Sequence, residues 1–253
     1  SDGSEDGLMP NPMKSLFADS EIASIVRRME LLPLLVRRQQ EELILEQVPV
    51  PSDWLEEQRK AFLGDQPLSK ALESRGWSES DLNLHLQRPE SLHRFAKQRF
   101  GPGLEDSFLA SHGGRDQVIY SLLRVRNAGL ARELWIRLEE GETTFAEAAH
   151  QHGVGEEAQR KGVIGPISVG SLQPKVLQEI LRSLRPGQLS APQQLGEWHV
   201  LMRLEQLKPA RFDEAMRERM YQEALDAFLE ERVKRVLAGE AESLEPIHYD
   251  PES

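Results

Sequence analysis

The chain has 253 residues, of which 39% are hydrophobic and 29% charged, and its formal net charge is −11. Apolar residues recur periodically, which excludes wholesale disorder, and the length allows one large domain or two modest ones. The absence of cysteine excludes disulfides, thiolate metal sites and a cysteine nucleophile. Neither a basic patch nor a long apolar run stands out, so we expect no nucleic-acid partner and no membrane span.

The first part of the chain predicts an all-helical module over residues 19–112. Residues 1–18 are polar, and we expect them to form a disordered tail. Ser78 and Asp81 have the spacing of a capping box, which marks the start of a helix. We expect a helix break at each proline, so that the helices occupy residues 19–32, 33–48, 52–63, 67–75, 78–87, 89–100 and 104–111.

The periodicity changes after residue 112. Residues 117–125 (QVIYSLLRV) are short, rich in branched side chains and bounded by glycine and asparagine, which predicts a strand. The expected order then becomes strand, helix, helix, strand, helix, strand, which defines one small α+β domain with an antiparallel-type sheet at residues 116–208. The elements that follow the first strand are expected at residues 127–139, 145–151, 163–167, 174–184 and 197–206.

The last part of the chain predicts a long amphipathic helix. An apolar stripe along residues 212–237 cannot remain unburied, so we expect residues 211–238 to pack on the N-terminal helices. The small domain is then an insertion in a mostly helical, chaperone-like module, and the fold class is α+β. Residues 239–253 are acidic, and we expect a solvated tail.

Four sequence blocks within residues 116–208 follow the order of a known family. They are the first strand, the helix ending in TFAEAA, the segment RKGVIGPISVGSLQPKV and the closing segment RPGQLSAPQQLGEWHVLMRLE. Together they resemble a parvulin-type peptidyl-prolyl isomerase domain. The whole chain is similar to the SurA and PrsA class of foldases, in which a helical chaperone module surrounds a parvulin domain. Its ending resembles that of cyanobacterial parvulin-like proteins.

The resemblance implies positions for catalytic side chains. Parvulins place two facing histidines beneath an acid or a cysteine. The first histidine position falls on Ser121, or on Tyr120 if the register shifts by one residue, and the second falls on His199. The acid position falls on Gly155, and the glutamates that follow it could replace the acid only if the loop is rearranged.

The resemblance also implies a substrate pocket for the proline ring. The pocket methionine of the family corresponds to Leu172, and the pocket phenylalanine corresponds to Val176. We expect Trp198 and Leu201 to border the same groove. With Gly155, these residues are the predicted substrate-binding set.

These correspondences imply a peptidyl-prolyl cis-trans isomerase or foldase that binds proline-containing segments of unfolded polypeptide clients. The reaction needs no covalent chemistry, because a site that favours the twisted amide lowers the barrier of about 18–20 kcal/mol. Loss of one histidine and of the acid predicts a degenerate catalytic site. The alternative is a non-catalytic peptide-binding chaperone or adaptor for a peptide maturation or export system.

The sequence predicts no cofactor and no metal site. His150 and His152 are two residues apart at a helix end, which is a poor geometry for a metal ion. A secretion or maturation partner is compatible with the resemblance. We expect a cytoplasmic protein, the alternative being an exported or periplasmic one whose leader has been removed.

Overall fold

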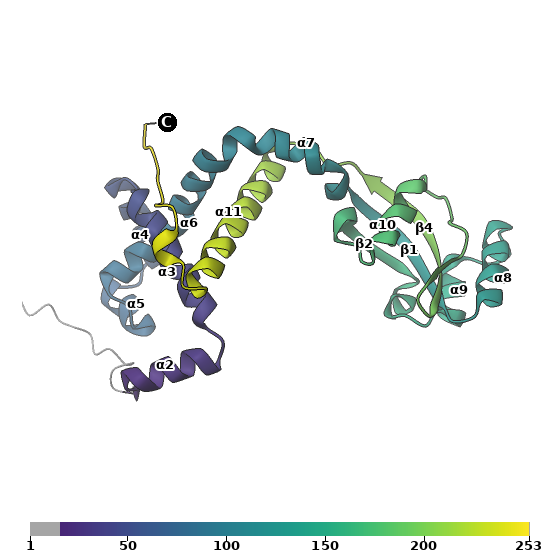
Figure 1. Ribbon diagram of the computed structural model, residues 1–253, viewed down its shortest axis with the longest axis horizontal. Helices are drawn as coiled ribbons and strands as arrows, with labels where there is room; N and C mark the ends of the chain where they lie inside the picture. The colour runs from purple at the N-terminus through teal and green to yellow at the C-terminus, as the bar shows by residue number, and fades with distance from the viewer. Residues whose placement is uncertain (1–15, 253) are drawn as a thin grey trace, which may run out of the picture. The chain divides into compact units, whose positions relative to one another are not determined.

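The computed structural model of the protein describes residues 16–252 (Figure 1). The predicted disordered tail, residues 1–18, therefore falls almost entirely outside the described residues. The chain divides into two compact units: residues up to Glu105 together with those from Glu214 onward form one, and Asp106–Asp213 form the other. Within residues 16–252, no helix has the length and apolar character needed to span a bilayer.

The first unit is helical. The capping box predicted at Ser78 is present: its Oγ accepts from the Asp81 N–H at 3.1 Å, and Asp81 Oδ2 accepts from the Ser78 N–H at 2.9 Å. The helices of this unit are α2 (Asp19–Arg28), α3 (Leu32–Gln47), α4 (Ser52–Leu63), α5 (Leu68–Arg75), α6 (Glu79–Phe100) and α11 (Glu214–Leu237).

The predicted break at Pro89 is wrong, because α6 runs through this proline as one helix. The reason is tertiary. On one side of the proline, Gln87 Nε2 donates to the carbonyls of Leu45 and Val48 at 3.1 Å each. On the other side, Ser91 Oγ donates to the Val48 carbonyl at 2.7 Å. These bonds satisfy carbonyls at the C-terminal end of α3 and hold both halves of α6 against it, which offsets the missing N–H of the proline.

The core of this unit lies between α3, α6 and α11. It is built from side chains that are at most 2% exposed, and α11 buries its apolar stripe there against helices that precede it by more than 100 residues. Removal of this apolar surface from water is the main favourable term in packing the three helices. The fully buried members are Ile44, Val48, Phe95, Ala96, Leu225 and Leu229.

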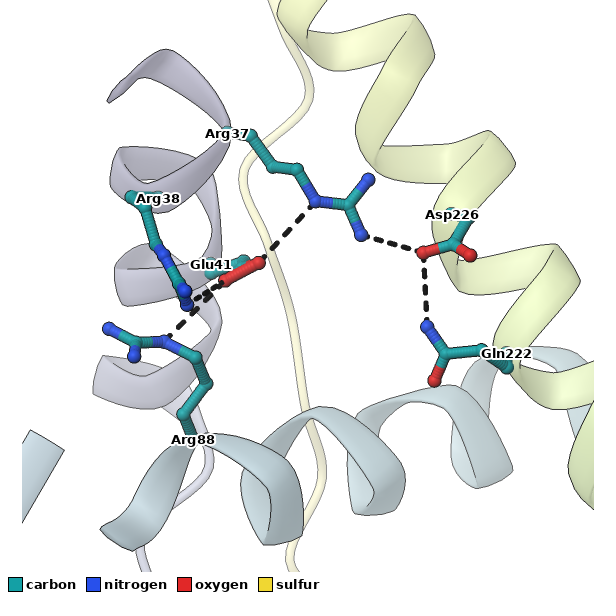
Figure 2. Close-up of polar contacts among 6 residues, drawn as sticks. All are labelled: Arg37, Arg38, Glu41, Arg88, Gln222 and Asp226. Atoms are coloured by element: carbon teal, nitrogen blue, oxygen red, sulfur yellow. Dashed lines mark hydrogen bonds and ion pairs between the residues drawn. The ribbon is translucent and has the colours of Figure 1, made fainter. Parts of the chain in front are cut away.

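A polar network joins the same three helices (Figure 2). Glu41 of α3 is only 5% exposed, and its carboxylate pairs with Arg38 at 3.2 Å, with Arg37 at 3.5 Å and with Arg88 of α6 at 3.5 Å. Arg37 Nη2 also reaches Asp226 of α11 at 2.6 Å. The buried carboxylate is therefore neutralised by arginines from two helices, as a buried charge requires.

The expectation of a solvated C-terminal tail is wrong for part of residues 239–252. Ile247 and Tyr249 pack against the helical core, and the Asp250 N–H donates to Gln98 Oε1 at 2.9 Å. The predominance of acidic residues suggested exposure. However, burial of the two apolar side chains is favourable, and the flanking carboxylates stay exposed and hydrated, so they do not oppose it.

The second unit confirms the predicted α+β class. Its sheet is entirely antiparallel with strand order β2-β1-β4-β3, and α7 (Leu104–Arg115) precedes it. The short strand β3 was not predicted, because three residues carry no recognisable period. The elements are β1 (Gln117–Val125), α8 (Ala128–Glu139), α9 (Phe145–His152), β2 (Val163–Ser168), α10 (Lys175–Ser183), β3 (Gln193–Leu195) and β4 (Trp198–Lys208).

The two faces of this sheet carry separate cores. One face, with Val118 and Leu122 of β1, packs against α10. The other face, with Leu123 of β1 and Leu201 of β4, packs against α8 and α9. Because side chains alternate along a strand, neighbouring residues of β1 and β4 belong to different cores.

Candidate functional site

A pocket of about 720 Å³ opens on the α10 face of the sheet. Its volume lies within the range of about 300–1,000 Å³ that is usual for ligand sites. Strands β1, β2, β3 and β4, the start of α10 and the loop before β2 all contribute to it. Its lining residues are Tyr120, Leu122, Arg124, Glu157, Ile164, Gln173, Pro174, Val176, Leu177, Gln194, Leu195, Gly196, Trp198 and Val200.

The structure places the predicted substrate-binding residues in different positions. Val176 and Trp198 line the pocket. Leu172 is 4% exposed and belongs to the core beneath the pocket rather than to its wall. Leu201 is fully buried in the core on the opposite face of the sheet. Only two of these four side chains are therefore brought together at the pocket.

The predicted catalytic pair lies on the face of the sheet opposite the pocket. Ser121 is 1% exposed and its Oγ donates to Glu205 Oε1 at 2.9 Å, while His199 lies between two pocket-lining neighbours on β4 and so faces away. The side chains that line the pocket are Tyr120 and Trp198, each one residue earlier. A shift of one residue moves a side chain to the other face of a sheet, which explains why the pocket is lined by Tyr120 instead of Ser121 and by Trp198 instead of His199. In β1 it is Tyr120, the residue of the alternative register, that lines the pocket.

Gly155 supports the site without lining the pocket. Its φ of −89° is accessible to any residue, so its backbone does not require glycine. A Cβ there would instead overlap the Glu157 carboxylate oxygens and Arg124 Nη2. The glycine therefore leaves room for a pair of charged side chains.

That pair places a carboxylate next to Gly155. Arg124 Nε donates to Glu157 Oε1 at 2.7 Å, and Arg124 Nη2 donates to Glu157 Oε2 at 2.9 Å. The Glu157 side chain is 8% exposed and the Arg124 side chain 32% exposed. The short 3-10 helix Glu156–Arg160 turns Glu157 toward the sheet. Such two-pronged pairing fixes the orientation of the carboxylate as well as its charge.

Arg124 was missed by the sequence analysis, although a signal was present. It is the one charged residue in the apolar run QVIYSLLRV, and its place in the alternation puts it on the same face as Tyr120. Its Cζ lies 5.7 Å from the Trp198 ring centroid, and the Cζ of Arg126 lies 4.8 Å from it. Both guanidinium groups are within the range of cation–π attraction.

The electrostatics of the pocket follow from burial and from the charged pair. Burial and the nearby Glu157 carboxylate raise the pKa of the Tyr120 phenol, and Arg124 opposes this shift. The hydrogen bond to Glu157 raises the pKa of Arg124. At neutral pH the pocket therefore presents a neutral O–H donor, a paired carboxylate and apolar walls. Within residues 16–252, no group of three His, Asp or Glu side chains is arranged to hold a metal ion.

This geometry can be compared with known proteins. Residues 125–225 match the family model of the PPIC-type PPIASE (rotamase) domain. The match confirms the predicted resemblance of this part of the chain to parvulin-type peptidyl-prolyl isomerases. The matched residues include Glu157 and Trp198 but leave out most of β1, including Tyr120 and Ser121.

Several solved structures are similar to the chain. The peptidylprolyl isomerase PrsA of Bacillus anthracis is 21% identical, with a TM-score of 0.47 and coverage of 83% of this chain and 96% of that one. PrsA of Bacillus cereus is 19% identical, with a TM-score of 0.48 and coverage of 89% and 88%. The parvulin domain of PpiD from E. coli is 20% identical, with a TM-score of 0.34 and coverage of 39% and 95%. No curated protein matches the chain.

Proposed function

We propose that the protein is a parvulin-type foldase whose pocket binds proline-containing peptide segments and whose catalytic site is degenerate. The observation that carries this proposal is the pocket itself, in which Tyr120 and Trp198 face the space between β1, β4 and α10. The Arg124–Glu157 pair lies at the same pocket.

Peptide binding rests on the apolar walls. Ile164, Val176 and Leu195 are partly buried and pack against the core beneath the pocket, so they offer a preformed apolar surface. A proline ring that covers this surface removes apolar area from water, at roughly 25 cal/mol per Å². Because the walls belong to strands and to a helix, binding requires little ordering of the protein.

Catalysis requires more than binding. The twisted amide in the transition state must be held more tightly than the planar amide, because only this difference lowers the barrier. Tyr120 can donate one hydrogen bond as a neutral phenol, and Glu157 is already engaged by Arg124. The Trp198 ring can donate only through its Nε1–H. Each hydrogen bond lost in the transition state costs about 1 kcal/mol, so we expect slow turnover.

The helical unit supplies a second surface for unfolded clients. Met29, Leu32, Leu34 and Leu35 follow one another closely and are all exposed, between 47% and 65%. Contiguous exposed apolar residues of this kind are typical of surfaces that bind other chains. The secretion or maturation partner and the cellular compartment stay predictions from the sequence.

The test uses the full chain and a short proline peptide, with binding measured by NMR shifts and turnover by cis-trans exchange spectroscopy. Trp198→Ala should weaken peptide binding at least about fivefold, because the ring forms a wall of the pocket. His199→Gln is the matched control, since it changes the next residue of β4 on the opposite face, and it should leave binding within about twofold.

The outcomes separate the alternatives. Binding with slow exchange supports the degenerate isomerase, and binding without any catalysed exchange supports the non-catalytic adaptor. Loss of binding in His199→Gln but not in Trp198→Ala would contradict the proposed site.

A further inference from the structure

A second cavity, of about 660 Å³, lies within the helical unit between α6, α11 and the C-terminal segment. We call it the helical groove. It is separate from the pocket described above, and the proposed function does not use it. Its lining residues are Phe95, Arg99, Phe100, Ala224, Ala227, Phe228, Glu231, Arg232, Arg235, Ser243, Leu244, Glu245, Pro246, Ile247 and His248.

The floor of the helical groove is aromatic. Phe228 lies 5.4 Å from Phe95 and 6.2 Å from Phe100 between ring centroids, so the three rings form one cluster. Leu244 and Ile247 of the C-terminal segment close one side. Aromatic rings at such distances form a rigid apolar surface.

Two arginines of the helical groove have no anionic partner among residues 16–252. Arg232 is only 9% exposed, and its Nε and Nη1 donate to Gln40 Oε1 and to the Glu245 carbonyl, each at 2.8 Å. Both acceptors are neutral. Arg99 lies with its Cζ 4.9 Å from the Phe228 ring centroid. Arg235, by contrast, is paired with Glu240 at 3.1 Å.

Glu231 and Glu245 also line the groove, but both are exposed and neither forms an ion pair with Arg99 or Arg232. Burial, and then repulsion from Arg235 and Arg99, lower the pKa of Arg232, while the Glu245 carboxylate opposes this shift. The guanidinium has five N–H donors, of which two have acceptors, so three are left for a ligand. A buried cation that lacks an anionic partner is unfavourable, and an anion that enters the groove relieves this cost.

We propose that the helical groove binds an amphipathic carboxylate, in which an aromatic or aliphatic body rests on the phenylalanines and the carboxylate lies against Arg232 and Arg99. The planar fork of a guanidinium matches the two oxygens of a carboxylate. The volume suits a small molecule of this class. An apolar ligand without charge satisfies the floor of the groove but leaves the two arginines unpaired.

The experiment uses the full chain with 4-phenylbutanoate as probe and the neutral 4-phenylbutan-1-ol as its matched control. Methyl NMR of labelled alanines reports the location, because Ala224 and Ala227 line the groove, whereas Ala148 and Ala149 lie in the other unit. We expect saturable shifts at Ala224 and Ala227 with the carboxylate. We expect the alcohol to bind at least about fivefold more weakly.

Variants test the role of charge. Arg99→Gln should weaken carboxylate binding about three- to tenfold, and because Arg99 is exposed, the variant should fold normally. Arg94→Gln is the control on the same helix: Arg94 pairs with Glu90 at 2.8 Å and does not line the groove. It should bind the carboxylate as the wild type does.

Three results would overturn the proposal. They are no shift at Ala224 and Ala227 at millimolar carboxylate, equal affinity for acid and alcohol, and unchanged affinity in Arg99→Gln. Since the peptide pocket lies in the other unit, failure here leaves the proposed function untouched, and failure of peptide binding leaves this site untouched.

Discussion

The two faces of the sheet in the second unit are built from the same strands but have different surroundings. On the pocket face, Tyr120, Arg124 and Trp198 border open space and carry polar or aromatic groups. On the opposite face, Leu123 and Leu201 are at most 1% exposed beneath α8 and α9. Alternate residues of one strand thus line a pocket or fill a core. Mutations at two neighbouring positions of one strand should therefore alter different properties, peptide binding at one and stability at the other.

The largest effect should come from the closed face. Leu201→Ala should lower the free energy of unfolding of the second unit by about 2–5 kcal/mol, because it leaves a cavity in a filled core. The folded fraction should still bind proline peptide. Urea unfolding followed by near-UV circular dichroism measures the first effect, and NMR titration measures the second. If peptide affinity falls in proportion to stability, the two faces are not independent.

A smaller effect is expected at Gly155, which borders the charged pair. Gly155→Ala should cost about 1–3 kcal/mol in unfolding free energy, because the added methyl displaces Glu157 from Arg124. Gly141→Ala is an instructive control: its φ is +73° and no atom lies near its Cβ position, so its cost of about 1 kcal/mol comes from the backbone alone. Only the first variant should also change peptide binding. If Gly155→Ala binds the proline peptide as tightly as the wild type does, the Arg124–Glu157 pair does not organise the pocket.

The register of β1 gives a prediction about turnover. Tyr120→His places an imidazole in the pocket and should raise the rate of proline exchange several-fold, because it adds a hydrogen-bonding group on the correct face. Ser121→His places the same ring among buried residues beside Glu205, costs about 1–3 kcal/mol in stability and should not raise the rate. Exchange NMR on both variants checks this. A gain in Ser121→His alone would favour the register that places the first histidine position on Ser121.

The smallest effect concerns pH. The pKa of Tyr120 is raised in the folded state above its ordinary value of about 10, so the neutral phenol is favoured by folding. The resulting stability is present below that ordinary value and is lost as the pH rises through the folded pKa. Tyr120→Phe should therefore lose less stability than the wild type between neutral and alkaline pH. Parallel alkaline losses in the two proteins would contradict the assigned environment of the phenol.

Much of the fold could be predicted from the sequence, because the periodicities are strong. The change from helical to strand patterns near residue 112 and the capping box at Ser78 depend on local chemistry that the chain itself displays. The break predicted at Pro89 was wrong because Gln87 and Ser91 bond to the end of α3, which is about 40 residues away in the sequence. Ile247 and Tyr249 were misjudged for the same reason.

The site was harder to predict than the fold. A resemblance aligns residues only to within a position or so, and in a strand one position decides the face. His199 has the residue type of the family's catalytic position, whereas Trp198 and Tyr120 line the pocket. Glu157 was considered only as a substitute, since no local pattern shows that the short helix at Glu156–Arg160 turns its carboxylate toward Arg124.

The division of the helical unit along the chain has a consequence for synthesis on the ribosome. Asp106–Asp213 are contiguous, so the second unit can fold as soon as these residues emerge. The first unit cannot, because Val48 and Phe95 are covered by Leu225 and Leu229, which are made more than 100 residues later. Its apolar residues therefore stay exposed while the inserted unit is translated. A chain built in this way has an unfinished helical core during most of its synthesis, and this core is completed only once α11 has been made.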